Sequence, residues 1–176
     1  MKMLTYMRDG SPSCGVLTDR GVVDVPASWN NAEPPKSIKE ILDRGPACLD
    51  QVRELAESAE RATPLDAIQL LAPIPRPGKI LALAGNYSEH IKEASLHRGF
   101  QLGLSESPRR TTTPRPFLMP STCVVGPGVT VAWPAYSEQI DYELELAVVI
   151  GRDAKSVPAS DALNYIAGYT VANDVS

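Results

Sequence analysis

The chain has 176 residues, an apolar fraction of 43% and a formal charge of −4. This length suits one ordinary globular domain or two small ones, and the acidic balance without a basic stripe argues against a nucleic-acid-binding protein. The three cysteines are too widely spaced for a disulfide framework or a zinc motif, and no stretch approaches the roughly 18 apolar residues of a membrane span.

The N-terminus and the cysteines also predict the compartment. Residues 1–9 contain no long apolar segment of the kind found in secretory signals. Unpaired cysteines are typical of proteins from a reducing environment. We therefore expect a cytoplasmic protein that has no nucleic-acid or membrane partner.

Residues 1–72 predict a small N-terminal module of strands and helices. Short apolar runs separated by turn residues predict a three-stranded meander, with strands at 3–7, 14–17 and 22–25. Two helices are expected next, at 38–44 and 49–61. Ser37 is the predicted N-cap of the first, with Glu40 in a capping-box position, and Gly45-Pro46 is expected to end that helix.

A proline-rich joint at 73–78 predicts a linker, because proline stiffens the chain and removes hydrogen-bond donors. A second domain is expected over 79–176. It should begin with an apolar strand at 79–84 and a helix opened by Ser88. The polar, proline-containing segment at 97–116 has the length of a lid, a binding loop or a disordered segment. Further strands are expected at 117–119, 129–133 and 165–172.

Acidic residues alternate with apolar ones just before an apolar run. Asp141, Glu143 and Glu145 share one face of the expected strand, at about 6.5–7 Å spacing, and Tyr142, Leu144 and Leu146 should pack on the other face. A second acid, Asp174, follows the strand at 165–172. Carboxylates gathered in this way repel one another unless a cation holds them.

Two interpretations of these acids remain open. They could form a solvated strand face, which is common in half-exposed sheets. Alternatively, they could bind a hard divalent ion through oxygen ligands, with Mg²⁺ or Mn²⁺ preferred and Ca²⁺ a further candidate. The apolar flanks and the acid at the end of the second strand favour the metal site.

His90 and Glu93 form a second candidate site. At positions i and i+3 they share one face of the expected helix. A carboxylate beside an imidazole orients it and raises its basicity, which suits a general base. The alternative is an ordinary surface pair. Their position directly after a buried strand favours a functional role.

An ordered set of motifs in the second half resembles the fumarylacetoacetate hydrolase family. The motifs are Gly85-Asn-Tyr-Ser-Glu-His90, Pro116-Phe117, Gly126-Pro-Gly128, the segment 141–151 and the segment 168–176. The resemblance covers roughly residues 78–176. It implies an α+β, β-rich fold in which the N-terminal module precedes part of a mixed β-roll.

The resemblance also implies site residues and chemistry. The metal ligands would be Glu143, Glu145 and Asp174, with Asp141 orienting them, and His90 with Glu93 would be the catalytic dyad. The family hydrolyses carbon–carbon bonds of acylpyruvates and other 1,3-dicarbonyl compounds or 2-oxo acids. It also includes decarboxylases and keto–enol isomerases. A homodimer is expected of a full-length member.

The resemblance extends over only part of the family's catalytic domain. We therefore expect the chain to be truncated after the first half of that domain, without the second half that completes the roll. This leaves a second hypothesis. The chain could be a non-catalytic remnant, a β-rich module that binds metal weakly or depends on a partner chain.

Overall fold

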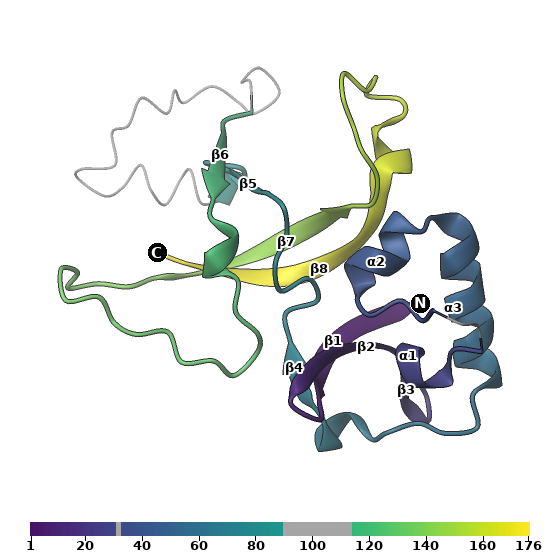
Figure 1. Cartoon of the computed structure of the whole chain (residues 1–176). Helices are drawn as coiled ribbons and strands as arrows, with labels where there is room; N and C mark the ends of the chain where they lie inside the picture. Colours follow the sequence, from purple (N-terminus) through teal and green to yellow (C-terminus); the bar gives the residue numbers. More distant parts are fainter. Residues whose placement is uncertain (31–32, 90–113) are drawn as a thin grey trace. The chain divides into compact units, whose positions relative to one another are not determined.

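A computed structural model describes residues 1–30, 33–89 and 114–176 of the chain (Figure 1). The chain divides into two compact units, one made of Met1–Pro75 and Val125–Ser176, the other of Arg76–Val124. Strands outnumber helices among the described elements, so the predicted α+β, β-rich fold class is confirmed. Within these ranges, no helix combines the length and the apolar character needed to cross a bilayer.

The first unit opens with a four-stranded antiparallel sheet in the order β3-β2-β1-β4. Its strands are β1 Lys2–Arg8, β2 Ser11–Thr18, β3 Gly21–Asp24 and β4 Gln69–Leu71. The predicted meander is confirmed, and Asp9 and Gly10 form its first turn with φ values of 49° and 78°. The strand β4 was not predicted. It follows a 3-10 turn at Leu65–Ala67 and pairs with β1.

Three helices belong to the same module: α1 Val25–Ser28, α2 Ile38–Asp43 and α3 Pro46–Ser58. Ser37 caps α2 as predicted, because its hydroxyl accepts the backbone N–H of Glu40 at 3.1 Å. The prediction for Gly45-Pro46 is wrong in part. These residues begin α3, since proline fits the first position of a helix, where no N–H partner is needed.

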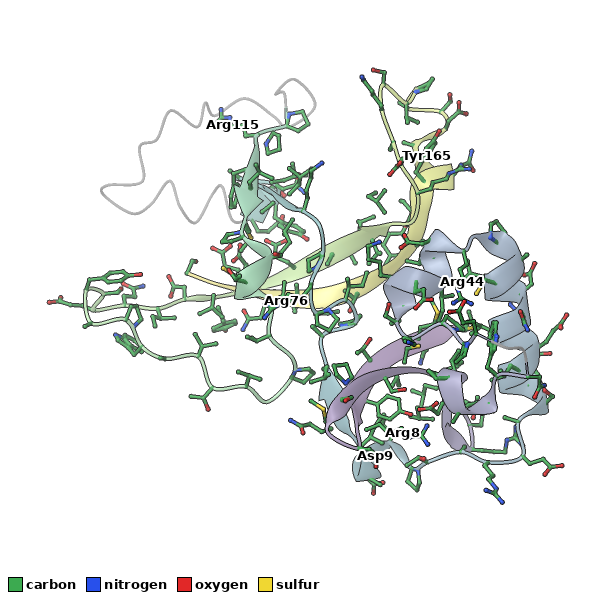
Figure 2. All side chains as sticks on the ribbon, viewed as in Figure 1. Arg8, Asp9, Arg44, Arg76, Arg115 and Tyr165 are labelled. Atoms are coloured by element: carbon green, nitrogen blue, oxygen red, sulfur yellow. The ribbon has the colours of Figure 1, made fainter. Side chains whose placement is uncertain are left out.

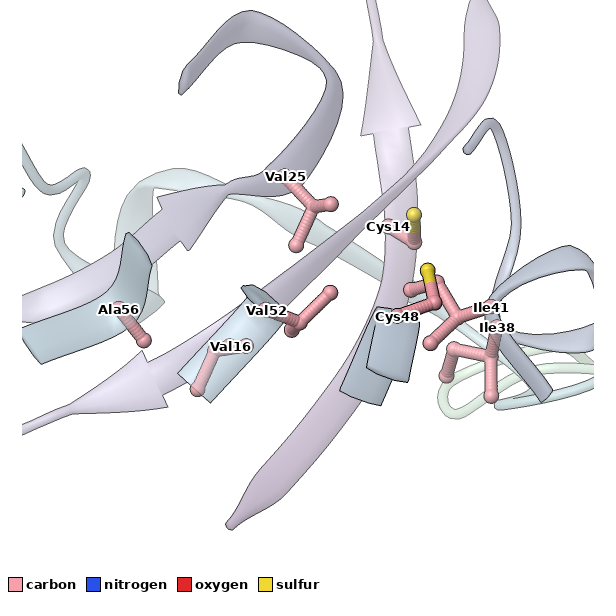
Figure 3. Close-up of a cluster of buried hydrophobic side chains, with 8 residues drawn as sticks. All are labelled: Cys14, Val16, Val25, Ile38, Ile41, Cys48, Val52 and Ala56. Atoms are coloured by element: carbon pink, nitrogen blue, oxygen red, sulfur yellow. The ribbon is translucent and has the colours of Figure 1, made fainter. Parts of the chain in front are cut away.

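The core of the first unit lies between the sheet and these helices (Figure 3). Its side chains come from β2, α1, α2 and α3, and they are Cys14, Val16, Val25, Ile38, Ile41, Cys48, Val52 and Ala56. Burial of a large aliphatic side chain contributes about 1.5–3 kcal/mol. Among the described residues, every buried apolar side chain lies between Tyr6 and Ala72, so the N-terminal module contains the hydrophobic core.

The carboxylate of Asp24 joins β1, β2 and α1. One oxygen accepts hydrogen bonds from the Tyr6 hydroxyl at 2.5 Å and the Ser13 hydroxyl at 2.9 Å, and it pairs with Arg8 at 2.8 Å. The other oxygen accepts the backbone N–H of Ala27 at 2.6 Å, which caps α1. Figure 2 shows Arg8 beside Asp9, where β1 ends.

Burial alone would raise the pKa of Asp24. The hydrogen bonds from Tyr6, Ala27, Arg8 and Ser13 outweigh that effect and hold the pKa below its usual value. These surroundings raise the pKa of Tyr6, whereas they lower that of Asp24. Burial, followed by the hydrogen bond to Asp24, raises the pKa of its hydroxyl. The pair is therefore stable as a neutral phenol that donates to an ionised carboxylate.

The second unit contains the antiparallel pair β5 Ile80–Leu83 and β6 Pro116–Met119, followed by a 3-10 turn at Ser121–Cys123. Both strands were predicted at these positions. Leu83 lies opposite Pro116, and the Ala84 N–H donates to the Arg115 carbonyl at 3.0 Å. The chain therefore leaves β5 and enters β6 at the same end of this small sheet.

The strands β7 Tyr142–Ile150 and β8 Ile166–Val175 form a two-stranded antiparallel ladder in the first unit. The segment between them includes a 3-10 turn at Ala162–Tyr165. The strand predicted at 129–133 is not formed. An alternating apolar pattern needs a partner strand, and this segment pairs with none in the described ranges.

The expectation that one face of β7 packs into an apolar interior is wrong. Tyr142, Leu144 and Leu146 are 83%, 75% and 60% exposed. Strand alternation shows which residues share a face. It does not show whether anything covers that face.

We expect Asp24→Ala to lower the free energy of unfolding of the N-terminal module by about 3 kcal/mol, because a hydrogen bond to a charged group contributes about 1.5–3 kcal/mol. The contribution of Asp24 should also depend on pH. Its pKa is lower in the folded than in the unfolded chain. The stabilisation is therefore complete above the unfolded pKa of about 3.9 and disappears as the pH falls through the folded pKa.

Urea unfolding followed by circular dichroism between pH 7 and pH 2 measures both effects. Asp24→Asn is the matched control, because it keeps the shape of the side chain and removes the titration. Its stability should decline less steeply in acid than that of the wild type. Identical pH profiles for the two proteins would contradict this role of Asp24.

Candidate metal site

The ladder of β7 and β8 brings two of the predicted ligands directly opposite each other. The register pairs Tyr142 with Val175, Glu143 with Asp174 and Leu144 with Asn173. Side chains of directly opposed residues in an antiparallel pair leave the same face, with Cβ atoms about 4.5–5.5 Å apart. Glu143 and Asp174 are therefore neighbours across the ladder, although 31 positions separate them in the sequence.

The third predicted ligand, Glu145, lies on this same face, which we call the acidic face. Its cross-strand partner is Ala172, and the next pair along the face is Ala147 with Thr170. All three carboxylate residues are partly buried, whereas the apolar residues on the opposite face are exposed.

Asp174 lies within β8, not after it. The sequence predicted that the strand ends before Asn173-Asp174, but pairing continues through Val175 to two hydrogen bonds between Asp141 and Ser176. The Asp141 N–H donates to Ser176 at 2.7 Å and the Ser176 N–H donates back at 3.2 Å. The ladder thus holds the backbone of Asp174 on both sides.

One residue that supports the acidic face was not predicted. The Asn173 side-chain oxygen accepts the backbone N–H of Glu143 at 3.1 Å. This contact holds the backbone of Glu143, the predicted ligand opposite Asp174. No sequence motif indicates it, because it depends on the register between two strands.

Asp141 was predicted to orient the ligands. Its carboxylate oxygens accept hydrogen bonds from the Gln139 amide at 3.3 and 3.2 Å. This contact holds Asp141 at the end of the ladder, beside Ser176. Its role toward a metal stays a prediction.

Within the part of the chain that the structure describes, the acidic face forms no ion pair with a lysine or arginine, since no salt bridge includes Glu143, Glu145 or Asp174. Nor do any three His, Cys, Asp or Glu side chains in that part converge closely enough to hold a metal ion. The backbone therefore presents the three carboxylates on one face, and side-chain rotation would have to bring their oxygens together.

The donor set nevertheless fits a hard divalent cation. Three carboxylates on one face provide only oxygen ligands, which Mg²⁺, Mn²⁺ and Ca²⁺ prefer. Like charges on one face also repel one another, and a bound cation would relieve that repulsion. The chemistry of the residues thus agrees with the predicted site.

The predicted dyad of His90 and Glu93 lies outside the described residues, as do residues 97–113 of the predicted lid. The structure does place the start of their segment. Gly85 follows β5 with a φ of 59°, a conformation that favours glycine, and Ser88 and Glu89 are helical. The strand that precedes this segment, β5, is not buried as predicted, because Leu81 and Leu83 are 64% and 43% exposed. The role of His90 and Glu93 stays a prediction.

Comparisons with known proteins identify the family. The family model described as fumarylacetoacetate (FAA) hydrolase C-terminal matches residues 79–176. The protein named oxaloacetate tautomerase Fahd2a, mitochondrial, from Rattus norvegicus is 34% identical over 89% of this chain and 45% of its own length. The chain spans about half the length of the relatives it matches.

Solved structures show the same fold. The fumarylacetoacetate hydrolase from Exiguobacterium antarcticum matches with a TM-score of 0.73 and 28% identity, over the whole of this chain and 56% of that one. Maleylpyruvate hydrolase from Sphingobium, solved in complex with manganese(II) and pyruvate, matches with a TM-score of 0.67. At 24% identity over 99% of this chain and 58% of that one, its similarity establishes the shared fold. The chain therefore belongs to the fumarylacetoacetate hydrolase family, as its motifs predict.

Proposed function

We propose that this chain carries the divalent-metal site of an enzyme that acts on small 2-oxo acids or 1,3-dicarbonyl compounds. The observation that carries the proposal is the cross-strand pair of Glu143 and Asp174, with Glu145 on the same face. Family membership supports the assignment of these acids as ligands. The preferred ion is Mg²⁺ or Mn²⁺, with Ca²⁺ as a further candidate.

Each part of the site has a distinct role in this proposal. Glu143, Glu145 and Asp174 would hold the ion, which acts as a Lewis acid toward negative charge that develops on the substrate oxygens. His90, oriented by Glu93, would move a proton. In hydrolysis, His90 takes the proton from the attacking water; in isomerisation, it transfers a proton to or from a substrate carbon.

Two reactions remain candidates. Hydrolysis of a carbon–carbon bond in an acylpyruvate is supported by the fold relative from Exiguobacterium antarcticum, which is named a fumarylacetoacetate hydrolase. Keto–enol isomerisation is supported by the relative from Rattus norvegicus, which is named an oxaloacetate tautomerase and matches most of this chain. Both reactions need stabilisation of an enolate, which a divalent ion held at the acidic face would supply.

We expect the chain to bind one Mn²⁺ ion and Glu143→Ala to weaken that binding at least tenfold, because the variant removes one of three anionic ligands. Electron paramagnetic resonance of Mn²⁺ titrated with protein measures the bound fraction directly. Glu138→Ala is the control, since it removes an exposed acid outside the acidic face. Equal weakening in both variants, or no binding to the wild type, would rule out the ligand assignment.

We expect His90→Ala to lower turnover by about 10²–10⁴-fold, the range for loss of a general acid–base group, with Mn²⁺ binding unchanged. The substrates are an acylpyruvate and the enol form of oxaloacetate, each followed by its ultraviolet absorbance. His97, the other histidine of the chain, is the matched control, and His97→Ala should keep full turnover.

Turnover and Mn²⁺ binding, measured together, also distinguish an active enzyme from a non-catalytic chain. A chain that binds Mn²⁺ but turns over neither substrate would be a non-catalytic metal-binding module that depends on a partner. Turnover that is equal in wild type and His90→Ala would reject the dyad and keep the metal site.

A further inference from the structure

Asn173 is a polar residue on the face of the ladder opposite the acids, which we call the apolar face. It lies across from Leu144, whereas Asp174 beside it lies across from Glu143 on the acidic face. Its neighbours Leu144 and Val171 are apolar and are 75% and 70% exposed. Asparagine is depleted in strands. A specific contact, rather than packing or strand propensity, therefore distinguishes this position.

That contact reaches the backbone of a predicted metal ligand. The Asn173 side-chain oxygen on β8 accepts the backbone N–H of Glu143 on β7 at 3.1 Å, and the two strands run side by side (Figure 1). Hydrogen-bonded pairs recur at every second residue of an antiparallel ladder. Asp141 and Ser176 form such a pair. Glu143, two residues further along β7, therefore also directs its N–H toward β8, where Asn173 meets it.

The contact acts on Glu143 without occupying the acidic face. Successive side chains of a strand leave opposite faces, so Asn173 approaches the Glu143 backbone from the side away from the carboxylates. The nitrogen that it binds is bonded to the Cα atom from which the Glu143 side chain leaves. Among the described residues, no side chain makes the same kind of contact with the backbone of Glu145 or Asp174. Glu143 is therefore the most restrained of the three acids at this level.

We propose that Asn173 is a positioning residue for the divalent ion and holds Glu143 in the direction that ligation needs. The inference rests on the proposed function, because it takes Glu143 as a ligand. Asn173 itself would touch neither the ion nor the substrate. A ligand that is already restrained loses less conformational freedom when the ion binds, and metal sites depend on such supporting hydrogen bonds.

Electron paramagnetic resonance of Mn²⁺ titrated with the whole chain tests this role. We expect Asn173→Val to raise the Mn²⁺ dissociation constant about tenfold, the lower end of the range for residues that support metal ligands. Valine removes the acceptor but favours strands and suits the apolar face. The urea midpoint of the variant, followed by circular dichroism, should therefore not fall below that of the wild type.

The spectrum of the bound ion gives a second measurement. At saturating protein, the line shape of Mn²⁺ bound to Asn173→Val should differ from that of the wild type, because the Glu143 carboxylate would approach the ion differently. Asn173→Asp keeps an oxygen acceptor for the Glu143 N–H and should bind Mn²⁺ at least as tightly as the wild type. Asn164→Val makes the same replacement in the 3-10 turn before β8 and is the matched control with wild-type binding.

The outcomes separate this role from the metal site itself. Wild-type affinity in Asn173→Val would refute the role of Asn173 and leave the ligand assignment intact. Weaker binding that comes with a lower urea midpoint and an unchanged spectrum, or that Asn173→Asp shares, would refute it in favour of a purely structural contribution to the ladder. A wild-type chain that binds no Mn²⁺ would refute the proposed function and, with it, the positioning role.

Discussion

The antiparallel register of β7 and β8 is the constraint on which the proposed metal site depends. Because side chains alternate along a strand, a shift of one residue would move Asp174 to the opposite face from Glu143. The ladder is regular over the acidic residues, and its one irregularity lies at Val149 and Ile150, away from them. Next to that irregularity, Gly151 lies against Ala167, where a Cβ atom would come within 2.8 Å of the alanine side chain. The close approach of the strands therefore requires glycine at this position.

The hydrophobic core and the acidic face lie in different segments of the chain. The N-terminal module has a core formed by β2 and three helices, and the Asp24 cluster joins its strands to α1. The ladder that carries the acids is held mainly by the hydrogen bonds between its two strands, since its apolar face is exposed. Two-stranded sheets are only marginally stable by themselves. A surface that covers the apolar face would therefore also make the acidic face more rigid, and rigid ligands bind metal more tightly.

Local sequence signals predicted those parts of the fold that depend on local interactions. The meander follows from turn residues such as Asp9-Gly10, and the start of α2 follows from the cap at Ser37. The strand β4 was missed because three residues, Gln69–Leu71, become a strand only by pairing with β1. The segment 129–133 was predicted wrongly for the converse reason, because it has the pattern of a strand but no partner in the described ranges.

The candidate metal site was likewise predictable where it depends on local spacing, and not where it depends on pairing between distant segments. The spacing of Glu143 and Glu145 within one strand predicted their common face directly. The position of Asp174 opposite Glu143 depends on the register, which the sequence alone indicates only through the motifs shared with the family. The contact between Asn173 and the Glu143 backbone could not be predicted, because it arises from that register. The exposure of Leu144 and Leu146 could not be predicted either, because it depends on what covers the strand.

The central claim is that carboxylates from two paired strands share one divalent ion. A crystal structure of the chain grown with Mn²⁺, with the ion located by its anomalous scattering, tests this claim most directly. We expect one manganese site at coordination distance from oxygens of Glu143, Glu145 and Asp174, over the acidic face. A manganese ion bound elsewhere, with these three carboxylates directed away from one another, would contradict it.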